Sequence, residues 1–170
     1  MPNTFELIAS STVGSGGAAS IDFTSIPSTF TDLAVYIAVR GSASAGRGYV
    51  NASINGVTTN RTWRWLVGYD SNLVSSASGT NDTFGSIPCA TATASTFSNV
   101  MGYFPNYASS NNKSFSVDST AENNSASTWM NFLLAGLWSN SSAISSLSFY
   151  PDSGTFVQYS TAYLYGVKNA

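Results

Sequence analysis

The residues that most enzymes use for proton transfer are scarce in this chain. The sequence contains no histidine, which excludes Ser-His-Asp and Cys-His catalytic systems and imidazole metal sites. Asp118 and Glu122 are close enough in sequence to be considered as the carboxylate pair that glycoside cleavage requires. Their segment, 118–124, is rich in Ser, Thr and Asn and predicts a solvated loop. We therefore expect a protein that is not an enzyme.

Metal and cofactor sites have equally little support in the sequence. Asp70 and Asp82 stand alone in polar stretches, and the alternation of Asp and Asn around a Gly that a calcium loop requires is missing. Cys89 is the only cysteine, so no disulfide can form within the chain. It follows Pro88 and has no cationic neighbour in sequence that would activate a thiol. The pattern predicts a small buried residue at Cys89, no metal and no cofactor.

A cluster of cationic and aromatic residues begins at Arg61 and includes Trp63, Arg64, Trp65 and Tyr69. Such a cluster could stack bases or sugars, or fill a pocket on a partner. In a strand, Arg61, Trp63 and Trp65 fall on one face and Arg64 falls on the other. Three interpretations follow: a core strand with a cation over an aromatic ring, a protein interface, or a glycan or nucleic-acid site.

The last predicted strand, 155–167, carries a second aromatic group. Tyr159, Tyr163 and Tyr165 share one face, and Phe156 and Leu164 share the other. Both faces are apolar enough to be covered. If the tyrosine face is not covered within one copy of the chain, we expect it to form a subunit contact, because tyrosine combines contact area with a polar tip.

The elements that position these residues read as strands, because apolar residues recur with period two between Gly, Ser, Asn and Pro. Asn55-Gly56 predicts a two-residue hairpin turn after the strand 49–54, with 61–67 as the return strand. The segment 68–94 predicts long loops with one short strand near Phe84, and we expect a contact surface there. The length of 128–138 would also allow a helix, but apolar residues on both alternating faces indicate a central strand covered on both sides. The remaining strands are expected at 4–10, 20–24, 32–40, 96–104, 113–118, 143–150 and 155–167.

The short predicted strands set the fold class, and length and composition limit the number of domains and the partners. The 170 residues are 43% hydrophobic, 14% aromatic and only 8% charged, with a net charge of −2. We expect one all-β domain over residues 1–170, an antiparallel β-sandwich with jelly-roll-like connections. The charge gives no field that would attract nucleic acid, and no apolar run approaches the roughly 20 residues of a membrane span. Nucleic acid and membrane are therefore not expected as partners.

Strand and turn motifs occur at 5–10, 14–23, 25–30 and 163–167 and at the Asn55-Gly56 turn. In these segments the chain resembles a group of tailed-bacteriophage virion proteins. It implies a β-rich virion structural protein, made in the host cytoplasm and located on the capsid surface. The expected role is that of a capsid decoration (cement) protein that binds the major capsid protein, and capsid geometry favours a homotrimer. The alternative is a tail or fibre domain that binds host surface glycans. No functional residue is implied by these segments.

Overall fold

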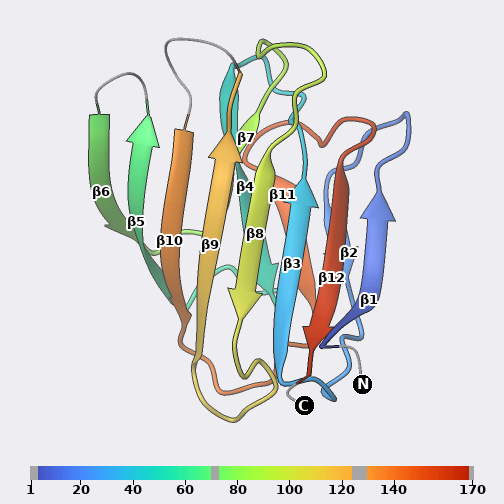
Figure 1. The fold of residues 1–170 in the computed structure, drawn as a ribbon, viewed down its shortest axis with the longest axis vertical. Coiled ribbons are helices and arrows are strands. Elements are labelled where there is room, and N and C mark those ends of the chain that lie inside the picture. The colour runs from blue at the N-terminus through green and yellow to red at the C-terminus, as the bar shows by residue number, and fades with distance from the viewer. Residues whose placement is uncertain (1–3, 70–72, 124–129, 169–170) are drawn as a thin grey trace.

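The computed structural model describes residues 4–69, 73–123 and 130–168, which form two antiparallel β-sheets. The larger sheet contains, in spatial order, β1 (Phe5–Thr12), β12 (Thr161–Val167), β3 (Asp32–Ala38), β8 (Asn99–Phe104), β9 (Lys113–Ala121), β10 (Met130–Trp138), β5 (Arg61–Tyr69) and β6 (Leu73–Gly79). The smaller sheet contains β2 (Ile21–Phe23), β11 (Leu147–Pro151), β4 (Arg47–Ile54) and β7 (Thr83–Pro88). The two sheets lie face to face (Figure 1), so the expected all-β antiparallel sandwich is confirmed.

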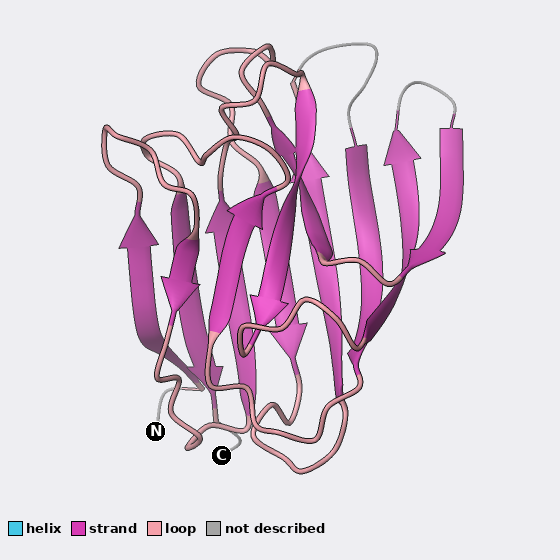
Figure 2. Ribbon diagram, turned by 180° about the vertical axis from the view of Figure 1, so that it is seen from behind, coloured by secondary structure: helices cyan, strands magenta, loops and turns pink. Residues whose placement is uncertain are grey.

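The chain crosses repeatedly between the two layers. β1, β3 and β5 belong to the larger sheet, whereas β2 and β4 belong to the smaller one. Later in the chain, β11 of the smaller sheet follows β10 and precedes β12, which both belong to the larger sheet. Figure 2 shows the smaller sheet in front, with its strands joined to the sheet behind by loops at both ends. Such crossings are typical of jelly-roll-like sandwiches, because each connection buries the inner faces of both sheets against each other.

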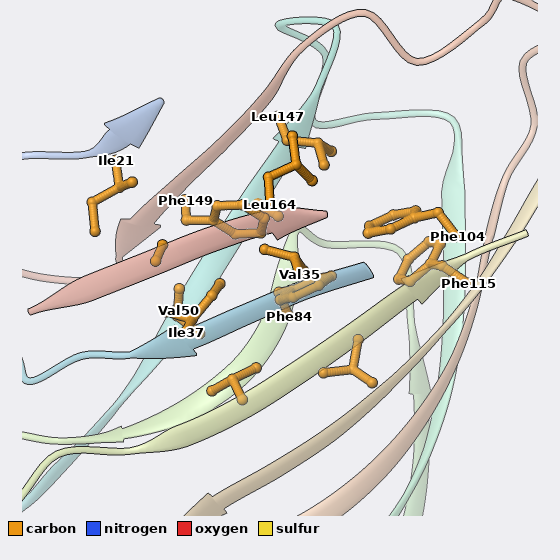
Figure 3. Packing of buried hydrophobic residues seen from close by; sticks show 14 of the residues in the cluster. Ile21, Val35, Ile37, Val50, Phe84, Phe104, Phe115, Leu147, Phe149 and Leu164 are labelled. Carbon is orange, nitrogen blue, oxygen red and sulfur yellow. The ribbon is translucent and has the colours of Figure 1, made fainter. Parts of the chain in front are cut away.

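The core lies between the sheets and takes every second residue of β8, β9 and β10. In β9 and β10 buried and exposed residues alternate over the full length of the strand. The rings of Phe84, Phe104 and Phe115 stack on one another with centroids 5.4 to 6.2 Å apart (Figure 3). The Phe115 ring rests on the bare backbone of Gly136, where an added Cβ would lie only 2.1 Å from it. The aromatic core therefore depends on a glycine that leaves room for a ring.

The Asn55-Gly56 turn forms as predicted. Both residues have positive φ angles, 51° and 73°, and Ile54 and Val57 exchange two backbone hydrogen bonds across the turn. The Asn55 side chain also binds the segment before β11, where its oxygen accepts from two backbone amides, those of residues 145 and 146. The turn is thus tied to the smaller sheet.

The predicted return strand, however, does not pair with the strand before the turn. β4 pairs with β11 and β7, whereas β5 crosses to the larger sheet and pairs with β10 and β6. The predicted hairpin between 49–54 and 61–67 is therefore wrong. A two-residue turn reverses only the residues next to it, and the intervening residues 57–60 carry the chain to the other layer.

The segment 68–94 contains two strands, β6 and β7, where long loops with one short strand were expected. β7 is buried along its full length. A Cβ added at Gly85 would lie 2.8 Å from Val50 and 2.9 Å from Val100, so small residues are required where β7 packs against both sheets. Small residues such as Gly and Ser are also typical of loops, which explains why the segment 68–94 was predicted to be mostly loop.

Three buried cations hold loops in place by binding backbone carbonyls. Arg40, Arg61 and Lys113 are 8%, 3% and 1% exposed. Their carbonyl acceptors lie at residues 90–96 for Arg40, at 52, 81 and 83 for Arg61, and at 109, 111 and 140 for Lys113. Desolvation lowers the pKa of both Arg61 and Lys113. Half of the six Lys and Arg residues therefore support the fold from inside.

Candidate functional site

The most unusual surface of the protein is the outer face of the larger sheet, the side turned away from the smaller sheet. Strand alternation brings large apolar side chains onto this face although no described element covers it. Ten large hydrophobic residues of the described chain are well exposed, and all but Tyr159 lie here. The nine are Phe5, Leu7, Tyr36, Leu66, Met101, Tyr103, Leu133, Leu137 and Tyr163. A contiguous apolar face of this kind marks an interaction site in most soluble proteins.

Strand register places these residues in rows across the sheet. One row runs from Tyr163 on β12 to Tyr36 on β3 and Met101 on β8. It continues through Asp118 on β9 and Leu133 on β10 to Leu66 on β5. These residues are direct cross-strand neighbours, so their side chains touch or nearly touch along the row.

The first part of the face, which we name the aromatic half, lies on β1, β12, β3 and β8. Tyr165 meets the rings of Phe5 and Tyr36 edge to face, with centroid distances of 6.4 and 5.7 Å. Together with Tyr163 these rings line a shallow depression. The other members of the aromatic half are Leu7, Met101 and Tyr103. The Tyr103 hydroxyl donates to Asp32, and this hydrogen bond is the main reason that the pKa of Tyr103 rises to about 12.

The second part, which we name the leucine patch, lies on β9, β10 and β5. Leu133 and Leu66 are directly paired on the neighbouring strands β10 and β5, and they are 58% and 53% exposed. Leu137 and Ala135 extend the patch along β10, and Arg64 and Asp118 lie at its sides. β10 was expected to be covered on both faces; this is wrong, because its alternate residues are exposed.

The predicted cationic and aromatic cluster is divided between the two faces of β5. Trp63 is buried and Trp65 is half-buried, and both point inward, where their rings stack with centroids 4.3 Å apart. Tyr49 of β4 also stacks on Trp65, with a centroid distance of 6.2 Å. The core interpretation therefore fits Trp63, and the predicted cation over a ring is Arg61 above Phe115, 6.0 Å from its centroid.

The remaining members of the predicted cluster and of the tyrosine group lie in different settings. Arg64 is exposed on the outer face, and Tyr69 ends β5 next to Met130, its side chain lying outside the described residues. Tyr163 and Tyr165 share the outer face as predicted, and no described element covers them. Tyr159 does not share it as a strand residue, because it lies in the turn before β12.

The carboxylates and the cysteine that were considered for catalysis or metal binding do not meet in one site within the described residues. Asp118 belongs to β9 and not to a loop, and it points to the outer face. Glu122 is exposed just after β9 ends. Cys89 is buried as expected, and desolvation raises its pKa. Within the described chain no three His, Cys, Asp or Glu side chains are grouped to hold a metal ion, and no helix is long and apolar enough to cross a membrane.

Comparison with known proteins gives no relative from which a function could be transferred. No protein-family model matches the chain, and no curated protein is significantly similar to it. The candidate site therefore rests on the geometry of the outer face alone.

Proposed function

We propose that the protein is a structural component of a bacteriophage virion, a capsid decoration protein that binds the major capsid protein. The resemblance of both chain ends to phage virion proteins suggests the setting. The observation that carries the proposal is the uncovered outer face, on which nine large hydrophobic side chains are exposed. A partner that buried these side chains would gain roughly 25 cal/mol of free energy for each Å² of apolar surface removed from water.

The composition of the aromatic half suits a protein partner. Tyrosine, phenylalanine and methionine are enriched in the centres of protein interfaces, where charged residues are depleted. The described part of this half combines Phe5, Tyr36 and Tyr163 with Leu7 and Met101. A binding site of this kind gains energy from ring and thioether area, with the tyrosine hydroxyls left to find polar partners at the edge.

A glycan-binding tail or fibre domain is the second candidate. The specific observation in its favour is the depression lined by Phe5, Tyr36, Tyr163 and Tyr165, which offers ring faces and hydroxyls without charge. Sugar rings stack on such platforms. Leu7 and Met101 beside the depression favour the protein partner, because aliphatic neighbours cannot hydrogen-bond sugar hydroxyls.

The test is binding to capsid shells that lack the chain, measured by co-sedimentation. Wild-type protein should bind and raise the melting temperature of the shell. Paired Tyr36→Ser and Tyr163→Ser substitutions should weaken binding by about 2 kcal/mol or more. Paired Tyr36→Phe and Tyr163→Phe substitutions keep the ring area and serve as the matched control. Wild-type protein that ignores shells but binds host cells saturably would replace the decoration role with the glycan role.

A further inference from the structure

The leucine patch contains the two exposed charged side chains of the described outer face, Arg64 and Asp118. Neither makes an ion pair within the described residues. An unpaired cation and an unpaired anion beside Leu66 and Leu133 are poorly placed in a face that a partner is to cover. Burying either without a counter-ion would cost several kcal/mol. A partner that covers the patch must therefore supply an anion for Arg64 and a cation for Asp118.

The register fixes the positions of the two charges. Arg64 pairs with Ala135, and Ala135 pairs with Ser116, two residues before Asp118 on β9. Arg64 and Asp118 are thus two strands apart and offset by two residues. With strand spacing of about 4.8 Å and a rise of about 3.3 Å, their Cα atoms are roughly 12 Å apart. The midpoint of the line between them lies over β10.

We propose that the leucine patch is covered by a second copy of this chain, related by a two-fold axis. The axis lies in the plane of the face, crosses β10 between Leu133 and Ala135, and runs perpendicular to the line from Arg64 to Asp118. Rotation about it places Arg64 of each copy against Asp118 of the other, so both charges are paired at once. The same rotation brings Leu66 of each copy near Leu133 of the other, where leucines close around the axis.

The two-fold contact covers β8 as well as the leucine patch, because Met101 directly neighbours Asp118, but it leaves free the rings on β12 and β1 at the far end of the aromatic half. That half begins at β8 and extends away from the axis to β1, beyond the strand that carries Asp118. The pair would therefore present two aromatic surfaces. The contact does not depend on the proposed capsid role, and it differs from the homotrimer expected from capsid geometry, because a cyclic trimer needs two different surfaces on each copy.

Sedimentation equilibrium of the full chain tests the proposal with charge-reversal variants. Wild-type protein should sediment as a dimer. Arg64→Asp and Asp118→Arg should each weaken association at least about tenfold, because each sets like charges against each other. The double variant, R64D with D118R, restores opposite charges at both contacts and should recover association to within about threefold of wild type. Asp152→Arg, a reversal at an exposed residue just after β11 of the smaller sheet, is the matched control and should not change association.

A thermal melt of each variant separates loss of association from loss of folding. Arg64 and Asp118 are exposed and make no ion pair in the described chain, so all variants should fold. A monomeric or trimeric wild-type protein would overturn the proposal, as would single variants that associate like wild type. A double variant that stays as weak as the single variants would also overturn it, because reciprocal pairing is its central claim.

Discussion

Replacement of Arg61 by methionine tests whether a buried guanidinium holds the loop between β6 and β7. Arg61 donates to the carbonyl oxygens of Ala52, Asn81 and Thr83 at 2.7, 3.1 and 3.4 Å, and it is 3% exposed. Losing a partner costs a buried carbonyl about 1–3 kcal/mol. Methionine fills similar volume and removes the cost of burying a charge, which offsets part of this loss. We expect Arg61→Met to lower the free energy of unfolding by about 3 kcal/mol.

Urea unfolding followed by tryptophan fluorescence measures this change, because Trp63 is two residues away on the same face. With an m-value of about 2 kcal/mol/M, the midpoint should fall by roughly 1.5 M. Lys168→Met is the control: it replaces an exposed cation whose salt bridge to Glu6 lies at the surface, and its midpoint should hardly move. An Arg61→Met midpoint equal to that of Lys168→Met would refute the role of the buried guanidinium.

Three further predictions concern single positions. Gly136→Ala should lower the free energy of unfolding by about 2–3 kcal/mol, since the new Cβ would overlap the Phe115 ring, and a neutral effect in urea unfolding would contradict that packing. Tyr159 has a φ of 70°, which is costly for an aromatic residue, so Tyr159→Asn should raise the free energy of unfolding by about 1 kcal/mol and with it the melting temperature. A lower melting temperature would indicate that the tyrosine ring makes stabilising contacts. The pKa of Tyr103 is raised from 10.0 to about 12, chiefly by its hydrogen bond to Asp32, so its contribution to stability is complete below pH 10 and is lost as the pH rises towards 12. Tyr103→Phe should reduce the decline in stability over this interval, and an unchanged pH profile would argue against the bond.

The sequence predicts most strands because each has one buried face. The alternation in β9 and β10 is visible as Phe115, Val117, Phe132 and Leu134 separated by other residues. Leu133, one of the exposed leucines of the outer face, could not be told from a core residue by the same pattern. Hydrophobicity marks a residue that needs covering, but it does not distinguish cover within the chain from cover by a partner.

Partners distant in sequence account for the features that the sequence does not predict. The pairing of β4 with β11 joins residues almost a hundred positions apart, and no local signal near Asn55 indicates it. The hydrogen bonds of Arg61 and Lys113 could not be predicted, because their carbonyl acceptors are backbone atoms and leave no trace in side-chain patterns. The outer face could be anticipated from the spacing of Tyr163 and Tyr165, whereas its extent required the strand order.

The position of β12 has a consequence for how the molecule reaches its folded state. β12 lies between β1 and β3 in the larger sheet, so β1 has no neighbour until residues 161–167 have been synthesised. During translation β1 and one edge of β3 therefore remain unpaired until β12 is made. Pairing of such distant segments is slow, and unpaired edges attract other chains while they wait. Yield during expression should thus depend on temperature and synthesis rate more steeply than the stability of the finished sandwich suggests.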